Sequence, residues 1–218
     1  MKNYILKYGK TTLIIPIIMF LIGLLFSNLY IILISIILII ICVNFFKRPI
    51  VRIIRDNNII VAPSYGRIMK IMRIKDQVYI STFLSLFDPH IQYIPYDGFL
   101  TNQVYKTGTF RIAFLFEKSA FNERMIHNIQ CKWGTISVVQ IAGMIARKIV
   151  SFLPPKIKVS RGQELGMIKF GSRVDIIVPL SANMEILVKP GDYVKGGETP
   201  LIRLDKYNID NKGERIRI

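Results

Sequence analysis

The sequence predicts a mainly β protein of the β-rich α+β class, preceded by an apolar helical hairpin at its N-terminus. Three observations predict this fold. Residues 13–46 form an apolar run without a charged residue. Short segments rich in β-branched and aromatic residues follow it, separated by Pro and Gly turn signals. Glycine-marked turns near the C-terminus are typical of barrel-sandwich-like hairpins. We therefore divide the chain into a membrane-anchoring hairpin at residues 1–48 and a β-rich domain at residues 49–218.

The apolar run is too long for one straight membrane-spanning helix. A helix over residues 13–46 would be roughly 50 Å long, whereas the hydrocarbon core of a bilayer is about 30 Å thick. Ser27 and Asn28 divide the run into two arms, and basic residues flank both of its ends. Positive charge on both sides favours keeping both ends in the cytoplasm. We predict a helical hairpin attached to the cytoplasmic face of the cell membrane, with a single tilted span as the alternative.

The composition limits the partners that the chain can take. Lys and Arg total 30 against 14 Asp and Glu, a formal net charge of +16. A basic chain with an apolar anchor favours anionic membrane lipids as partners, since each basic residue near an anionic leaflet contributes on the order of 1 kcal/mol. No nucleic-acid recognition pattern is present. Two cysteines, Cys42 and Cys131, and two histidines, His90 and His127, form neither a disulfide framework nor a metal-ligand spacing. We expect no metal and no nucleic acid.

The β-rich domain contains several strand candidates. Residues 58–62, 66–74, 77–86, 109–116 and 135–142 have strand-like patterns, and residues 143–153 fit either a strand or a short helix. Two later segments, 158–166 and 184–202, repeat a theme of β-branched residue, glycine turn and apolar strand. The second segment is similar to the hairpins of lipoyl and biotinyl carrier domains. Glu185 stands where the modifiable lysine of a carrier would be, so we expect the carrier fold without the carrier chemistry.

One dipeptide in the second half of the chain suits an unusual reaction. Gly171 and Ser172 lie between two apolar, β-branched stretches. A serine hydroxyl in this setting can attack the preceding carbonyl and convert the amide into an ester. β-Elimination then cuts the chain and leaves dehydroalanine, which loses ammonia to become a pyruvoyl group. Glycine has no Cβ to obstruct the attack. The product is a carbonyl electrophile that condenses with amines and accepts electrons. Gly-Ser alone is most often a turn or a strand bulge, so the surrounding residues decide its meaning.

The surrounding segments resemble the short bacterial form of the phosphatidylserine decarboxylase proenzyme. The matching segments are residues 83–90, 122–125, 138–149, 161–175 and 196–199. They follow the order of the family and span nearly the whole chain. The resemblance implies cleavage between Gly171 and Ser172 into a large chain, residues 1–171, and a small chain, residues 172–218. Residues 49–218 are then the catalytic domain.

The resemblance also implies the chemistry and its residues. Ser172 becomes the pyruvoyl group, so the pyruvate cofactor is made from the protein's own chain. This group forms a Schiff base with the amine of phosphatidylserine. Carbon dioxide leaves and phosphatidylethanolamine is released without an external cofactor. His90 matches the histidine that acts in decarboxylation or reprotonation, and the pKa of an ordinary histidine suits proton transfer near neutral pH. Arg173 beside the electrophile fits either an anion-binding residue or a solvated strand residue. His127 has no counterpart of this kind and is predicted at the surface.

Three positions depart from the family. Tyr65 stands where the family usually has an aspartate, and Tyr93 stands at the second histidine of the long-form self-cleavage triad, which short forms generally lack. Gln92 and Tyr93 replace the usual Asn-Arg pair. Loss of a carboxylate that orients a base can slow a reaction by orders of magnitude. Self-cleavage is then slower than usual or uses another base.

Several alternatives stay open from the sequence. The chain is either the decarboxylase or a non-catalytic membrane adaptor with the same fold. Two further alternatives are an unprocessed relative of the enzyme and a pyruvoyl decarboxylase that acts on another amine substrate. The partners expected for the first reading are phosphatidylserine, anionic membrane lipids and the two chains of one proenzyme. A homodimer is left open.

Overall fold

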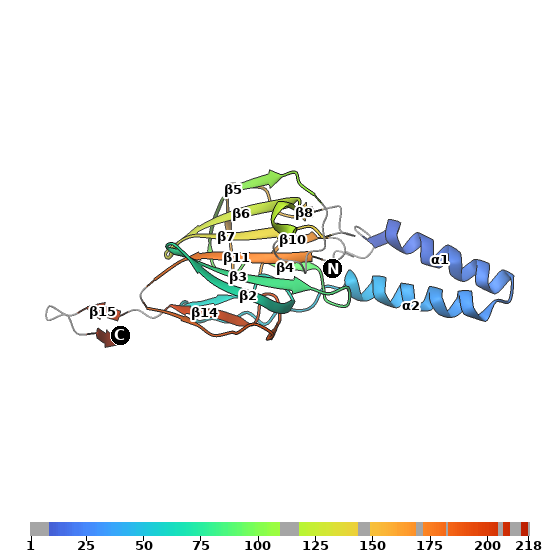
Figure 1. Cartoon of the computed structure of the whole chain (residues 1–218), viewed down its shortest axis with the longest axis horizontal. Helices are drawn as coiled ribbons and strands as arrows, with labels where there is room; N and C mark the ends of the chain where they lie inside the picture. Colours follow the sequence, from blue (N-terminus) through green and yellow to red (C-terminus); the bar gives the residue numbers. More distant parts are fainter. Residues whose placement is uncertain are drawn as a thin grey trace.

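The computed structural model describes residues 9–109, 118–143, 149–168, 172–181, 183–204, 207–209 and 215–217. Two apolar helices come first, α1 (Lys10–Leu25) and α2 (Leu29–Phe45), and a β-rich body follows them. The helices lie side by side and project from one end of the body (Figure 1). The α+β class and the N-terminal helical hairpin that the sequence predicted are therefore confirmed.

The hairpin turns where the sequence placed its break. Asn28 caps α2, because its Oδ1 accepts the backbone N–H groups of Tyr30 at 3.1 Å and Ile31 at 3.2 Å. Close packing of the two helices depends on Gly23, where an added Cβ would lie 2.9 Å from Cγ1 of Ile32. The apolar run is thus two helices of 16 and 17 residues and not one long span.

Most apolar side chains along both helices are exposed, with Ile15, Leu25 and Tyr30 at 65%, 78% and 79%. Among the residues that the structure describes, no helix combines the length and the hydropathy needed to cross a membrane.

Sixteen described strands and a short 3₁₀ helix form the body. In chain order they are β1 (Ile59–Val61), β2 (Gly66–Ile74), β3 (Gln77–Leu84), β4 (Ile91–Tyr93), β5 (Gly98–Lys106), η2 (Lys118–Phe121), β6 (Arg124–Cys131), β7 (Gly134–Ile141), β8 (Ile149–Ser151), β9 (Ile157–Val159), β10 (Glu164–Ile168), β11 (Ser172–Pro179), β12 (Met184–Ile186), β13 (Tyr193–Val194), β14 (Pro200–Leu204), β15 (Tyr207–Ile209) and β16 (Arg215–Arg217). The largest sheet has the order β13-β2-β3-β11-β7-β6-β5-β9. Smaller sheets have the orders β1-β14-β12, β4-β10-β8 and β15-β16.

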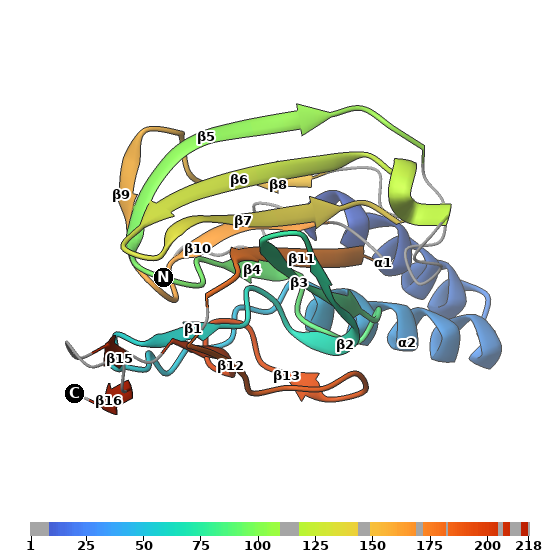
Figure 2. The ribbon, with the colours of Figure 1, turned by 60° about the vertical axis from the view of Figure 1, so that its left-hand side comes forward.

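Both three-stranded sheets pack against the same face of the large sheet, which is seen from a second side in Figure 2. Side chains at alternate positions of a strand share a face. On β11, Val174 packs with β10, whereas Ile176 and Val178 pack with β1 and β14. The sheets β4-β10-β8 and β1-β14-β12 therefore lie next to one another on one face of β11, and they bury the main core between the layers.

The predicted strands correspond closely to β1, β2, β3 and β7. Most of the candidate at 109–116 lies outside the described residues, as do 144–148 of the ambiguous segment. Its end is a strand, β8. Near the C-terminus, β12 and β14 pair antiparallel as the hairpin at 184–202 predicted.

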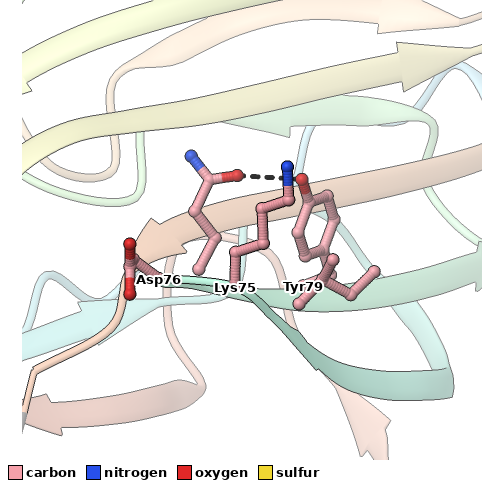
Figure 3. A pocket seen from close by; sticks show the side chains of 5 residues that line it. Lys75, Asp76 and Tyr79 are labelled. Carbon is pink, nitrogen blue, oxygen red and sulfur yellow. Dashed lines mark hydrogen bonds between the residues drawn. The ribbon is translucent and has the colours of Figure 1, made fainter.

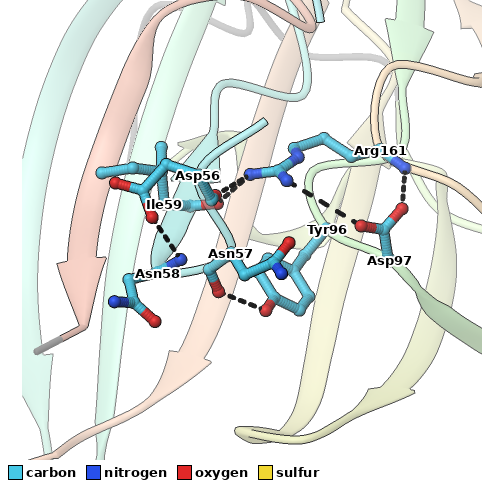
Figure 4. Close-up of polar contacts among 7 residues, drawn as sticks. All are labelled: Asp56, Asn57, Asn58, Ile59, Tyr96, Asp97 and Arg161. Carbon is cyan, nitrogen blue, oxygen red and sulfur yellow. Dashed lines mark hydrogen bonds and ion pairs between the residues drawn. The ribbon is translucent and has the colours of Figure 1, made fainter. Parts of the chain in front are cut away.

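The segment 158–166 turns where expected, but its two strands do not pair with each other. β9 pairs with β5, whereas β10 pairs with β4 and β8. Figure 4 shows the reason at the turn. The buried Arg161 donates from Nη1 to the carbonyl oxygens of Asp56 at 2.6 Å and Ile59 at 2.8 Å, and its backbone N–H donates to Asp97 at 2.8 Å. These long-range bonds hold the turn against the start of β1, and the two strands enter different sheets.

Candidate active site

Ser172 is the first residue of β11, between β3 and β7 in the large sheet. It lies directly opposite Leu84 of β3 and is fully buried. Within the described part of the chain, its Oγ has no hydrogen-bond partner. Buried hydroxyls are nearly always bonded, so an unpaired one calls for a chemical explanation. Gly171, the other half of the predicted cleavage site, lies outside the described residues.

Ser172 faces the layer that carries the histidine. Ser172 and Val174 share a face of β11, and Gln140 of β7 lies directly opposite Val174 on that same face. Gln140 in turn donates a 2.7 Å hydrogen bond to Gln92 of β4, two residues after His90. The serine hydroxyl and the start of β4 are thus on the same side of the large sheet.

His90 ends the loop between β3 and β4 and is fully buried. Its Nδ1 lies 2.7 Å from the carbonyl oxygen of Asp88. A carbonyl only accepts hydrogen bonds, so Nδ1 carries the proton of the neutral ring and Nε2 is left with a lone pair. No partner for Nε2 is found among the described residues. Burial lowers the pKa of His90 to about 4, although Asp88 opposes the shift. The ring is therefore neutral at physiological pH, with Nε2 available as a base.

The loop that carries His90 is held by its own aspartate. Asp88 Oδ2 accepts from the backbone N–H and the hydroxyl of Ser85 at 2.8 and 2.7 Å. Its other oxygen, Oδ1, accepts from the hydroxyl of Tyr193 at 2.7 Å. The His90 carbonyl also accepts from the backbone N–H of Ile168 at 3.3 Å, at the end of β10. One end of the segment 168–172 therefore contacts His90, and its other end, Ser172, pairs with the end of β3.

Helix α2 supplies one wall of the site. The Phe45 ring stacks on the His90 ring with the centroids 3.8 Å apart. The backbone N–H of His90 reaches the carbonyl oxygen of Phe45 at 3.5 Å, and Asn44 donates to the carbonyl oxygen of Phe87. Sequence reasoning missed Phe45, because a phenylalanine at the end of an apolar run carries no signal that distinguishes it from its neighbours. The helical hairpin is thus joined directly to the candidate catalytic loop.

Two of the three positions at which the sequence departs from the expected pattern, Tyr65 and Tyr93, are neighbours in the fold. Tyr65 and Tyr93 are both buried, with their ring centroids 6.3 Å apart. Burial raises the pKa of Tyr65 to about 12, with a further contribution from Glu198. Burial also raises the pKa of Tyr93, and more strongly. Neither phenol is ionised near neutral pH, so the pair does not reproduce an aspartate and a histidine.

Arg173 points to the opposite face of the sheet from Ser172, because side chains alternate along β11. It is 3% exposed, so the reading as a solvated residue is wrong. Its guanidinium lies 3.0 Å from both carboxylate oxygens of Asp175 and donates to Ser119 Oγ at 2.7 Å. Burial raises the pKa of Asp175, and the adjacent Arg173 opposes that rise. The structure does not bring the Arg173 side chain together with the Ser172 hydroxyl.

His127 is fully buried, and its predicted surface position is wrong. Its Nε2 lies 2.7 Å from Oε1 of Gln140. His127 lies between Ile126 and Asn128 on β6, and this local pattern does not reveal that the sheet β4-β10-β8 covers its face.

Two further features lie apart from this site. Among the described residues, no group of three or more His, Cys, Asp or Glu side chains could hold a metal ion. A cavity of about 460 Å³ lies at the β2–β3 turn, lined by Ile74, Lys75, Asp76, Gln77 and Tyr79 (Figure 3). Gln77 pairs with Pro179 at the far end of β11 from Ser172. The cavity is therefore at the opposite end of the β3–β11 pair from the chemistry.

Comparison with known proteins places this site in a family. The sequence profile described as phosphatidylserine decarboxylase matches residues 38–202. The chain is 35% identical over 208 residues to the phosphatidylserine decarboxylase proenzyme of Carboxydothermus hydrogenoformans, covering 92% of this chain and 93% of that protein. It is 37% identical over 183 residues to the proenzyme of the same name from Wolbachia pipientis, covering 78% and 79%. The proenzyme of Prosthecochloris aestuarii is 33% identical over 211 residues, covering 91% and 96%. The chain therefore belongs to the phosphatidylserine decarboxylase family, whose members are pyruvoyl-dependent carboxy-lyases.

Proposed function

We propose that this chain is a self-cleaving proenzyme that decarboxylates phosphatidylserine to phosphatidylethanolamine, with Ser172 as the source of its pyruvoyl group. The observation that carries the proposal is the buried, unpaired Ser172 Oγ at the start of β11. A hydroxyl in that position fits the nucleophile of self-cleavage. The family's reaction, rather than the fold alone, supplies the substrate class.

In the proposed cleavage, Ser172 Oγ adds to the carbonyl carbon of Gly171 and the peptide C–N bond breaks, which leaves an ester. Removal of the Ser172 α-proton then expels the Gly171 carboxylate and leaves dehydroalanine. Its tautomer takes up water, releases ammonia and ends as the pyruvoyl group of the chain 172–218. The residues present fit this group, since the apolar neighbours of Ser172 on the core face include Leu84 and Val174.

When formed, the pyruvoyl group supplies a carbonyl that takes up the substrate amine and accepts electrons as carbon dioxide leaves. We assign proton transfer to His90. Its neutral Nε2 accepts a proton from the substrate ammonium, which makes the amine nucleophilic, and returns a proton to the substrate α-carbon after carbon dioxide has left. The stacked Phe45 ring covers one face of the imidazole and contributes to its burial. For Arg173 we propose a positioning role, in which its ion pair with Asp175 holds the start of β11.

We also propose that the helical hairpin attaches the enzyme to the cytoplasmic face of the cell membrane. The exposed apolar side chains of α1 and α2 and the formal charge of +16 support contact with an anionic leaflet. Each helix is about 25 Å long at 1.5 Å per residue, shorter than the hydrocarbon core of about 30 Å, which fits a hairpin that enters the bilayer only in part. The docked end of α2 lies against His90, and we expect the lipid substrate to approach the site from the side of the hairpin.

The first test is the mass of the purified, membrane-extracted chain, together with its activity on phosphatidylserine vesicles. We expect two chains cut between Gly171 and Ser172, and a small chain that is blocked to N-terminal sequencing and reacts with hydroxylamine. Ser172→Ala is expected to stay a single chain of 25.1 kDa without activity. His90→Asn is expected to lose at least ~100-fold in kcat.

Ser160→Ala is the matched control, because Ser160 is an exposed serine in the turn before β10. It should be cut and active like the unaltered chain. An uncut, inactive chain in every preparation would contradict the proposal and favour the adaptor. Release of carbon dioxide from free serine, with none from vesicles, would instead identify a decarboxylase for another amine substrate.

A further inference from the structure

We propose that a line of hydrogen-bonded side chains, the half-buried Gln103 and the buried His127, Gln140 and Gln92, is the positioning machinery for His90. We call this line the amide relay. The proposal deepens the function proposed above and rests on the role assigned there to His90. The relay lies outside the reacting groups themselves, so its members are positioning residues.

The relay crosses from the large sheet to the small sheet β4-β10-β8. Gln103 on β5 contacts Nδ1 of His127 on β6 at 3.1 Å. His127 Nε2 lies 2.7 Å from Gln140 Oε1 on β7, and Gln140 Nε2 donates to Gln92 Oε1 on β4 at 2.7 Å. Gln92 Nε2 donates to the carbonyl oxygen of His90 at 2.8 Å. Four successive hydrogen bonds thus end on the residue that carries the candidate base.

Each bond of the amide relay runs in the same direction. The His90 carbonyl only accepts, so Gln92 Nε2 donates to it, Gln92 Oε1 accepts from Gln140 Nε2, and Gln140 Oε1 is left to accept from His127 Nε2, which carries the proton. His127 Nδ1 is then an acceptor for the Gln103 amide nitrogen, which also lies 2.9 Å from Ser151 Oγ and 3.0 Å from the Leu153 carbonyl oxygen. Reversing any member would set two donors or two acceptors against each other. Burial lowers the pKa of His127 to about 4, which keeps it neutral and preserves this direction at physiological pH.

The relay is buried at a cost that apolar packing would avoid. His127, Gln140, Gln92 and His90 are all fully buried. Buried polar groups are costly unless every one is satisfied, and a satisfied network rigidifies and specifies one arrangement. The backbone also makes room for it, because a Cβ on Gly166 would lie 3.0 Å from Gln140 Nε2.

The bond between Gln140 and Gln92 joins the two halves of the site. Gln140 lies opposite Val174, two residues after Ser172, and Gln92 lies two residues after His90. The amide relay therefore sets the position of the His90 ring relative to the strand that begins with Ser172. A displacement of about 1 Å between reacting groups can cost ~100-fold in rate.

The decisive variant is Gln140→Glu, which keeps the size of the side chain. The carboxylate still accepts from His127 but cannot donate to Gln92. Gln92 must then turn its amide toward the carboxylate, and the His90 carbonyl keeps only the backbone N–H of Ile168 as a donor. We expect kcat on phosphatidylserine vesicles to fall at least ~10-fold with little change in KM. We expect partial recovery as the pH is lowered, because protonation of the introduced carboxylate gives a carboxylic acid that can donate to Gln92 again.

The matched control is Gln130→Glu, which makes the same substitution at an exposed position of β6, where Gln130 accepts from Thr135 Oγ1 at 2.7 Å. It should leave kcat and its pH profile unchanged. Equal kcat and equal pH profiles for the Gln140→Glu variant and the unaltered enzyme would overturn the relay. If the Ser172→Ala and His90→Asn variants stay active, the proposed function itself fails, and the relay proposal fails with it.

A measurement independent of activity tests the direction of the relay. In the full-length Ser172→Ala chain, ¹⁵N NMR of the imidazoles should show His127 as the neutral Nε2–H tautomer and His90 as the Nδ1–H tautomer between pH 6 and 8. The opposite tautomer at His127 would overturn the proposal. This readout holds even where Gln140→Glu prevents folding.

Discussion

At the scale of single residues, the site is shaped by what surrounds two tyrosines and one histidine. Tyr65 and Tyr93 occupy neighbouring positions that the resemblance associates with an aspartate and a histidine, and their rings are 6.3 Å apart. Both phenols have raised pKa values because they are buried. A protonated phenol does not orient or activate a base as a carboxylate does. Burial keeps His90 neutral near pH 7, and its Nε2 has no partner among the described residues, so this nitrogen is the candidate proton acceptor.

Rebuilding the aspartate and histidine should accelerate maturation. In Tyr65→Asp/Tyr93→His, the carboxylate and the imidazole can bond to each other, and we expect self-cleavage at least ~10-fold faster than in Tyr65→Asp alone. The single variant buries a carboxylate without that imidazole. The measurement is the fraction of cut chain against time during cell-free synthesis with lipid vesicles.

The control for that pair is Tyr65→Phe/Tyr93→Phe, which removes both hydroxyls and adds no charge. Its cleavage rate should match the unaltered chain, because neither phenol ionises. A folded Tyr65→Asp/Tyr93→His variant that is cut no faster than the unaltered chain would show that these positions do not limit self-cleavage.

At the scale of elements, the helical hairpin packs into the β-rich body beside His90, in addition to the membrane role proposed for it. The end of α2 contributes Phe45 and Phe46 to an apolar cluster with Ile91, Tyr93 and Met167. Both phenylalanines are fully buried, in contrast with the exposed residues farther along the helices. Removing the hairpin would therefore uncover the His90 ring as well as weaken membrane attachment.

Replacing the Phe45 ring at the end of α2 should change the pKa of His90. Phe45→Leu keeps an apolar side chain but loses the stack on His90, which lets water approach the imidazole. We expect the pKa of His90 to rise from about 4 toward an ordinary value, and the acid limb of the kcat profile to move to higher pH with it. NMR titration in detergent measures the pKa of His90, and decarboxylation assays measure kcat.

Phe26→Leu is the matched control for Phe45→Leu, since Phe26 is 73% exposed at the turn of the hairpin. It should leave the pKa of His90 unchanged. An unchanged titration in Phe45→Leu would show that the stack does not exclude water from the ring.

At the scale of the whole molecule, two buried histidines make the fold sensitive to acid. Burial lowers the pKa of both His90 and His127 from 6.5 to about 4. Between these values the unfolded chain binds protons that the folded chain does not, so stability falls as the pH decreases. The stabilisation is complete above pH 6.5 and is lost as the pH approaches 4. Each histidine contributes about 3 kcal/mol over this interval.

Urea unfolding of the full-length Ser172→Ala chain from pH 8 to pH 4 measures this dependence. We expect the free energy of unfolding to fall steadily below pH 6.5. In His127→Gln the fall should be about half as large, although the variant starts less stable because the amide relay is broken. Equal slopes for the two chains would contradict a buried neutral His127.

Much of the fold could be predicted from the sequence. Period-2 patterns rich in β-branched residues placed β2, β3 and β7, and the break at Ser27 and Asn28 located the hairpin turn. Those patterns depend on local backbone preference and on which face of a strand is buried. They do not specify a partner, and β9 and β10 accordingly enter different sheets although they flank one turn.

The sequence by itself determined the classes of element and was enough to predict the chemistry proposed for Gly171 and Ser172, because both depend on neighbouring residues. Only the tertiary structure decided what surrounds Ser172 and His90. Phe45 reaches His90 across 45 positions of the chain, and Gln140 reaches Gln92 across 48. The tertiary structure also buries His127 and directs the Arg173 side chain to the face of β11 opposite Ser172. Contacts of this kind arise when separate sheets and a helix end pack together, and that packing minimises exposed apolar surface and unpaired polar groups over the whole molecule at once.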